Sequence, residues 1–260
     1  MAFTLDGVVI DRIQLGIAED FSGNLLYTLT QLSDATIDTS AESKEARDKD
    51  GVLIKKFWKA KSASLKATNA MMDFNILGEQ SGSGKTVATD SAPIQMPKVM
   101  IVDKTDEKID LTGMVTGTVR VNAIANNGTM GKSYAQSSAP STTEFGLASN
   151  KLSLPTDSEA SRFVIKYERS VTSGAMIDNR ADVFPRTIKL TLKCLAVDQC
   201  STDTLRSCYV VFPSFQISPE TSVQLTTDAS FDFSGEAAVQ YCAANKQLYY
   251  ICMAEDDIEE

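Results

Sequence analysis

The chain has 260 residues and a formal net charge of −9, from 34 Asp and Glu against 25 Lys and Arg. Hydrophobic residues make up 43% of it, which excludes a largely disordered chain, and the length suffices for one large β domain or two small domains. The acidic balance excludes a protein that gathers nucleic acid through phosphate contacts, because such contacts need clustered Lys and Arg. Histidine is absent, which excludes Ser-His-Asp and Cys-His catalytic arrangements and removes the commonest metal ligand.

The first third of the chain predicts short strands interrupted by a charged segment. Residues 3–18 and 25–32 carry short runs of β-branched and apolar residues, as strands do. Residues 38–51 form a charged arm that carries both signs of charge and ends at Gly51. One interpretation is a solvated surface loop, and the other is an arm that pairs with complementary charge on a neighbouring subunit. In the second case the candidate inter-subunit contacts are Glu42, Lys44, Glu45, Arg47, Asp48, Lys49 and Asp50.

The middle of the chain predicts one helix and one long loop. Residues 52–67 again have strand character, with lysines spaced among apolar residues. Asn69 resembles an N-cap, so we expect a short helix near residues 69–78. Residues 126–156 are rich in Ser, Thr, Ala and Gly, which bury little apolar surface, and we expect a flexible loop or insertion there.

The last hundred or so residues carry the clearest strand pattern. Apolar and polar residues alternate from Ile188 to Cys194, a period of two that buries one face of a strand. Strands follow one another with almost no helix between them, and that order favours an antiparallel fold over a parallel α/β sheet. We therefore predict a mainly β protein, an antiparallel β-sandwich or barrel with a short flanking α-helix and long loops, in a single domain over residues 1–260.

The five cysteines indicate neither a disulfide framework nor a zinc site. All lie in the last third of the chain, their number is odd, and none forms a Cys-x-x-Cys pair. We interpret them as small buried hydrophobic residues kept reduced in a cytosol. The start of the sequence lacks the pattern of a signal peptide, and no apolar stretch approaches the ~20 residues needed to cross a membrane. The sequence predicts a soluble protein made in a cytoplasm, with no membrane partner, metal or cofactor.

Three patterns that suggest chemistry have plainer interpretations. Residues 78–86 resemble a phosphate-binding loop, but Glu79 stands where the pattern needs a glycine, and the residues after Thr86 make a poor helix. Asp48 and Asp50 have the first spacing of a calcium loop, but apolar residues stand at the later ligand positions. Paired carboxylates can hydrolyse glycosides, but the sequence singles out no pair. We expect a protein that is not an enzyme.

The first third of the chain also resembles a known family. Residues 23–42 run through a strand into a Thr- and Glu-containing stretch, and a charged turn and a lysine-containing strand follow. This segment is similar to the major tail tube proteins of long-tailed bacteriophages, and Phe212-Pro213 before the final strands is similar too. The resemblance covers about the first third of the chain and, more loosely, the last fifth. The further residues that carry it are Lys44-Glu45, Asp48, Asp50-Gly51 and Ile54.

The resemblance implies a structural virion protein with a tail-tube-like β core and a helix on its flank. Such a protein assembles with copies of itself into hexameric rings, which stack into a tube for the ejection of genomic DNA. Sheets of adjacent subunits would join into one inner barrel, and the charged arm would contact the next ring or neighbour. The implied partners are further copies of the chain, other tail proteins (tape measure, terminator, baseplate or initiator), and DNA that passes without specific binding. The implied location is the virion tail, with assembly in the host cytoplasm.

Two other functions stay open from the sequence. A capsid decoration, baseplate or receptor-binding module would be a non-enzymatic binding domain that stays small in solution, with recognition carried by the loop of residues 126–156. A hydrolase that uses acids alone would need a specific Asp or Glu, and the sequence nominates none.

Overall fold

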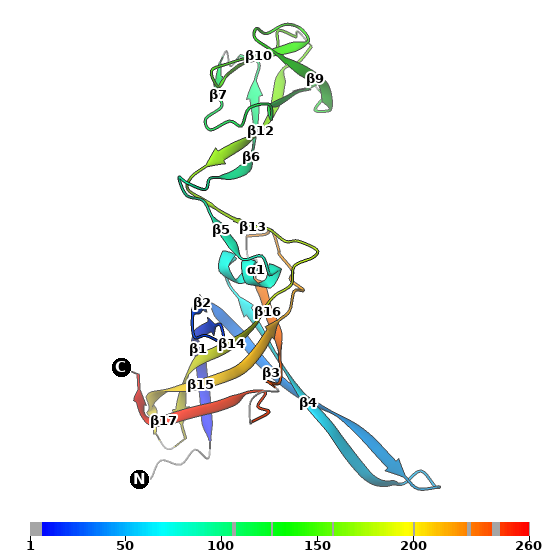
Figure 1. Ribbon diagram of the computed structural model, residues 1–260, viewed down its shortest axis with the longest axis vertical. Coiled ribbons are helices and arrows are strands. Elements are labelled where there is room, and N and C mark those ends of the chain that lie inside the picture. The colour runs from blue at the N-terminus through cyan, green and yellow to red at the C-terminus, as the bar shows by residue number, and fades with distance from the viewer. Residues whose placement is uncertain are drawn as a thin grey trace. The chain divides into compact units, whose positions relative to one another are not determined.

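The computed structural model describes residues 7–105, 108–125, 127–157, 159–199, 201–227, 230–240 and 245–259, without the side chains of residues 130, 201 and 202. These residues form a mainly β protein with largely antiparallel sheets and one short helix, which confirms the predicted fold class (Figure 1). The chain divides into two compact units, which we call the main unit (residues 1–85 and 177–260) and the inserted unit (residues 86–176). This division differs from the single domain that the sequence led us to expect.

The main unit is built on an eight-stranded sheet. Its strands are β1 (Val8–Glu19), β2 (Leu25–Leu29), β3 (Leu32–Arg47), β4 (Leu53–Asn69), β14 (Thr187–Asp198), β15 (Ser201–Ile217), β16 (Phe231–Ala237) and β17 (Tyr250–Ile258). The path through the sheet is β2-β1-β14-β15-β16-β4-β3, and β17 also pairs with β15. All of these pairings are antiparallel. Because β1 also contacts β3, the sheet curls around its own core.

The core of the main unit is formed by the alternating residues of these strands. From Ile188 to Cys194 every second side chain of β14 is buried, which confirms the predicted period of two. Three phenylalanines continue this core, with Phe215 lying 5.3 Å from Phe212 and 6.1 Å from Phe233 between ring centres. Phenylalanine is among the side chains that bury the most apolar area, so this cluster contributes a large share of the core.

The helix of the main unit, α1 (Phe74–Ser81), lies a few residues later than the sequence predicts. Asn69 is not its N-cap, because Asn69 is still the last residue of β4, where its side-chain amide donates to the carbonyl of Met71. Asp73 caps the helix instead, and its carboxylate accepts a hydrogen bond of 2.7 Å from the backbone N–H of Asn75. Within the described parts of the chain, no helix is long and apolar enough to cross a membrane.

The inserted unit contains a seven-stranded sheet. Its strands are β6 (Ile94–Asp103), β7 (Ile109–Asp110), β8 (Arg120–Ile124), β9 (Met130–Ser137), β10 (Glu144–Ala148), β11 (Lys151–Ser153) and β12 (Arg162–Val171). The order across the sheet is β6-β12-β8-β9-β10-β11-β7, and β9 and β10 are parallel. Where the chain passes between the two units, β5 (Lys85–Val87) pairs with β13 (Ala175–Ile177).

Residues 126–156 are not the flexible loop that their composition predicts, because β9, β10 and β11 lie within them. The segment has few large apolar residues, but those few are buried in the core of the inserted unit. Tyr134, Phe145 and Leu152 are buried there, and the ring of Tyr134 lies 5.7 Å from that of Phe163 on β12. The segment that the composition predicts to be a loop thus provides part of a second core, and this core explains why the chain forms two compact units.

One carboxylate links the strands of the inserted unit to the segment before β12. Asp157 accepts hydrogen bonds from the backbone N–H of Glu159 at 3.0 Å and from the hydroxyl of Tyr134 at 2.9 Å, and Lys132 lies 3.7 Å away. The hydrogen bond from the Glu159 backbone, followed by that from Tyr134, holds the pKa of Asp157 below its ordinary value. Burial is the main cause that raises the pKa of Tyr134 to about 12.

This arrangement predicts a loss of stability of the inserted unit in acid. A carboxylate with a lowered pKa stabilises the fold above its unfolded-state pKa of about 3.9, and this contribution disappears as the pH falls through the lower folded-state value. We expect Asp157→Asn to weaken the unit at pH 7 and to make its stability less dependent on pH below about 4. Protection factors of backbone amides in residues 119–167, measured between pH 7 and pH 3, would test this. An unchanged pH dependence in Asp157→Asn would contradict it, and Tyr134→Phe, which removes one donor, should give an intermediate result.

Candidate functional site

The most prominent surface feature of the main unit is the hairpin of β3 and β4, which extends as a two-stranded ribbon beyond the other strands of that unit (Figure 1). We call residues 40–62 the arm; this range includes most of the charged arm of residues 38–51 that the sequence predicts. Every residue of β4 from Leu53 to Ser62 is exposed, whereas the rest of β4 alternates between buried and less buried positions. At ~3.3 Å per residue, these ten residues extend the arm by about 30 Å.

The end of the arm is set by Asp48. Its carboxylate accepts hydrogen bonds of 2.9 Å from the backbone N–H of Asp50 and 2.8 Å from that of Val52. The chain then reverses through Gly51, whose φ of 83° lies in the left-handed region that favours glycine. The Asp48-to-Gly51 turn therefore joins the strands by local hydrogen bonds, and this explains its aspartate spacing without a bound cation.

One face of the arm carries a row of side chains that satisfy one another. Lys56 lies 4.7 Å from the ring centre of Trp58 and 4.0 Å from the carboxylate of Glu45. Glu45 also pairs with Arg47 at 2.6 Å, and Arg47 donates to the carbonyl of Gly51 at 2.8 Å. Exposed pairs of this kind contribute little stability one by one.

The opposite face of the arm keeps uncompensated positive charge. Ser43 pairs with Trp58 and Lys44 with Phe57, so Phe57 and Trp58 point to opposite faces. Lys55 lies 5.2 Å from the ring centre of Phe57. Among the described residues, Lys44 and Lys55 have no carboxylate partner within ion-pair distance. This face therefore combines an exposed aromatic ring with two cations that form no ion pair among the described residues.

The structure brings all seven predicted contact residues onto the arm or its turn. Asp48 builds the turn, Glu45 and Arg47 belong to the row beside Trp58, and Glu42 pairs with Lys59 at 3.4 Å. Their role in contacts between subunits stays a prediction. The seven residues lie on the β3 side and the turn: Glu42, Lys44, Glu45, Arg47, Asp48, Lys49 and Asp50.

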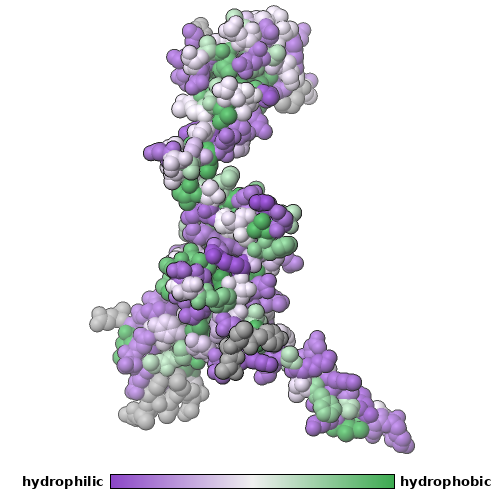
Figure 2. Space-filling view, viewed as in Figure 1, coloured by the Kyte–Doolittle hydropathy of each residue, from purple (hydrophilic) through white to green (hydrophobic). Residues whose placement is uncertain are grey.

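The sequence did not single out the apolar residues on the β4 side of the arm. Figure 2 shows hydrophobic residues among the hydrophilic ones along this ribbon. Large apolar side chains that stay exposed are typical of surfaces that bind another protein. The alternation of lysines with apolar residues after Gly51 could have indicated them. They are Val52, Leu53, Ile54, Phe57 and Trp58, which are between 47% and 68% exposed.

Several strands of the main unit leave a sheet edge unpaired. β2 pairs with β1 only from Gly16 to Glu19, so the first half of β1 has an open edge among the described residues. Within the described parts of the chain, β3 pairs only with β4, and β17 only with β15. An open edge presents unpaired backbone N–H and C=O groups, to which a strand of another chain can add.

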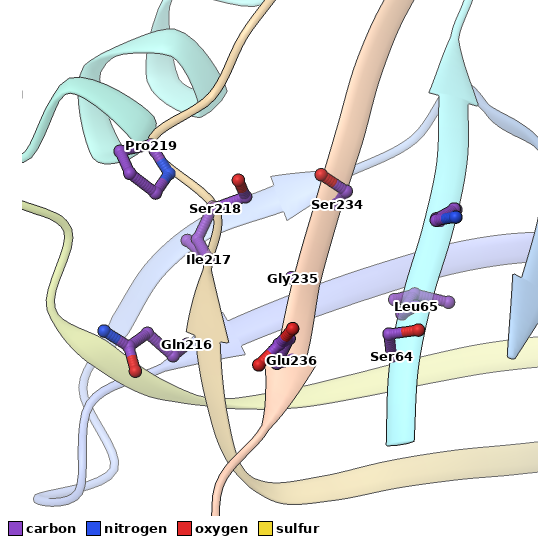
Figure 3. Close-up of a pocket in the computed structure, with 10 residues that line it drawn as sticks. Ser64, Leu65, Gln216, Ile217, Ser218, Pro219, Ser234, Gly235 and Glu236 are labelled. Carbon is purple, nitrogen blue, oxygen red and sulfur yellow. The ribbon is translucent and has the colours of Figure 1, made fainter. Parts of the chain in front are cut away.

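A pocket of about 500 Å³ lies beside β16. Figure 3 shows Ser64 and Leu65 of β4, Ser234 to Glu236 of β16, and Gln216 to Pro219 at the end of β15. Its titratable groups are Lys66 and Glu236, and no hydrogen bond joins its serine hydroxyls to Glu236 among the described residues.

The described residues contain no group of three or more Cys, Asp or Glu side chains placed to hold a metal ion. Cys194 and Cys208 face each other on β14 and β15, both buried, as their interpretation as small core residues predicts. Burial raises the pKa of Cys194 to about 11, which makes its thiol a poor nucleophile. That interpretation is wrong for Cys252, which is exposed, while Cys200 and Cys242 lie outside the described residues.

Open sheet edges and exposed apolar residues on an arm are features to which another protein chain can bind. The chain belongs to the YomU/Tube protein family, whose model matches residues 9–251. This membership indicates a tube-like structural protein of a phage, a class that is typically non-enzymatic and forms part of the virion tail. A comparison with curated proteins gave no match.

Proposed function

We propose that copies of this protein assemble into hexameric rings that stack into the tail tube of a long-tailed phage, the conduit for DNA ejection. The observation that carries this proposal is membership of the YomU/Tube family over almost the whole chain. The open sheet edges and the exposed arm support it, because they provide two separate kinds of contact surface on one molecule.

The open edges would form the contacts within a ring. An edge of one subunit that pairs with a different edge of the next is a head-to-tail contact, and such contacts close into rings when the rotation permits. The first half of β1 is available for this pairing, and its residues Val9 and Ile10 are more than half exposed. The sheets of neighbouring subunits would then form one inner barrel.

The arm would form the contacts between rings or neighbours. Its reach of about 30 Å is long enough to cross onto another subunit while its base stays within the sheet. The exposed aromatic residues would supply apolar contact area, and the charges would set the register and the choice of partner.

The charge balance supports a DNA conduit. The arm carries seven Lys and Arg and four Asp and Glu, a net charge of +3, so the other residues together carry −12. A tube built from the acidic part would repel the phosphates of DNA and let it pass without specific binding. Tape measure, terminator, baseplate or initiator proteins would be the further partners, and assembly would take place in the host cytoplasm.

Negative-stain electron microscopy of the purified protein over a concentration series tests the proposal. We expect tubes or six-fold rings whose fraction rises with concentration, because each contact is made between copies of the same chain. If the protein needs an initiator, tubes should appear when tail-initiation proteins are added. Uniform small particles under both conditions would contradict the proposal and favour a decoration or receptor-binding module.

A further inference from the structure

We propose that the arm of one copy docks on β17 of a second copy, through the face of the arm that carries Lys44, Lys55 and Phe57. This inference rests on the proposed function and specifies the partner surface of the arm. It follows from charge complementarity between two exposed surfaces of the main unit. Each surface has exposed apolar residues and charged side chains that form no ion pair among the described residues.

The arm side of this contact is basic and apolar. Lys44 and Lys55 project from the same face as Phe57, because Lys44 pairs with Phe57 and Ala46 with Lys55 across the ribbon. Phe57 is 51% exposed, so its ring still has area to bury. On the opposite face Lys56 and Arg47 both pair with Glu45, whereas Lys44 and Lys55 have no ion pair among the described residues, which is why we assign docking to the Phe57 face.

The β17 side is acidic and apolar, and one edge of β17 is unpaired among the residues that the structure describes. Ile251 and Ile258 are exposed by 57% and 54%. Between them the register against β15 shifts, and the exposed Glu255 and Asp256 fall in this irregular stretch. No ion pair is formed by either carboxylate among the described residues, whereas the nearby Glu259 is held by Lys193 and Ser207.

The other exposed apolar strands are poorer partners for a basic arm. On β6 of the inserted unit, Val99 and Ile101 are exposed, but Val99 lies opposite Lys166 on β12, which would repel the arm. The exposed first half of β1 carries the carboxylate of Asp11, and this is already paired with Arg12 at 2.7 Å. β17 combines exposed apolar residues with carboxylates that form no ion pair with another described residue, so it fits the arm best.

The test is a charge exchange between two full-length variants. The first, Lys44→Glu with Lys55→Glu, has an acidic arm, and the second, Glu255→Lys with Asp256→Lys, has a basic β17. We expect each variant alone to self-associate at least about tenfold more weakly than the unchanged protein, because like charges then meet. In an equimolar mixture each arm meets a β17 of opposite charge, so association should return. Sedimentation velocity of each variant and of the mixture measures this, and rising salt should weaken the restored association.

A control variant, Lys98→Glu with Lys166→Glu in the inserted unit, makes the same change in net charge as Lys44→Glu with Lys55→Glu and should associate normally. If the variants associate as well as the unchanged protein, or if the mixture does not regain association, the docking is wrong. Electron microscopy tests the proposed function separately. If the unchanged protein and both variants form tubes, the proposed function is supported and the docking on β17 is contradicted. If the mixture regains association but no sample forms tubes, the docking is supported and the proposed function is contradicted.

Discussion

Replacing residues 42–60 by Asn-Gly is expected to abolish assembly while the protein stays folded. Ala41 and Lys61 face each other across the hairpin, so a two-residue turn can join them directly. Asn-Gly is the preferred sequence for such a turn, since it adopts the type I′ geometry that matches the twist of the strands. The shortened protein keeps the part of β4 that packs in the core, which begins at Ala63.

The stability cost of this shortening should be small. Every residue of β4 from Leu53 to Ser62 is exposed, so the core loses no buried side chain. We expect the free energy of unfolding to change by less than about 1 kcal/mol, as for surface changes away from the core. The contribution of the arm to association is much larger, because an aromatic side chain buries about 150–250 Å² when it is covered. We therefore expect no tubes or rings at concentrations where the unchanged protein assembles.

Electron microscopy together with urea unfolding separates these two effects. Normal tubes from the shortened protein would show that the arm is a solvated ribbon without a role in assembly. A matched control removes exposed apolar residues elsewhere, with Val99→Ser and Ile101→Ser on β6 of the inserted unit. This control should assemble normally, whereas Phe57→Ser with Trp58→Ser on the arm should not.

The class of fold could be predicted from the sequence because buried strands repeat their pattern. From Ile188 to Cys194 the apolar residues recur at every second position, and the structure buries each of them. The helix boundary could not be predicted, because Asn69 and Asp73 are both good capping residues. Only the tertiary contacts of Asn69, at the buried end of β4, decide between them.

The arm and the inserted unit show why other parts of the fold could not be predicted from the sequence. A two-stranded ribbon with both faces in water needs no alternation, so residues 38–51 had the composition of a loop although most of them belong to β3. In residues 126–156 one or two buried residues per strand are enough to build the core of the inserted unit. Tyr134 and Phe145 therefore do not stand out in the sequence among the many Ser and Thr residues. The charged residues of the arm could be singled out because charge is visible in composition. The exposed apolar residues were missed, because apolar residues in a strand normally indicate a core.

Gly235→Ala is expected to destabilise the main unit by about 2–3 kcal/mol. Gly235 lies in β16 where that strand meets the end of β15. A Cβ at this position would lie 2.4 Å from the carbonyl oxygen of Gln216 and 2.5 Å from the tip of the Phe215 ring. Both distances are far below van der Waals contact, and the Phe215 ring cannot move away because it is fully buried against Phe233. Urea unfolding followed by far-UV circular dichroism measures the loss, and the neighbouring Glu236→Ala should change stability by less than about 0.5 kcal/mol.

A double-mutant cycle with Phe215→Ala identifies the cause of that loss. Phe215→Ala alone should cost about 3–5 kcal/mol, because it empties a fully buried site. In the double variant the ring no longer opposes the new Cβ, so the total cost should be smaller than the sum of the two single costs. The clash with the carbonyl oxygen of Gln216 remains, so the relief should be partial. Costs that simply add would show that the main chain alone excludes a side chain at Gly235, and that the close packing of β16 against Phe215 plays no part.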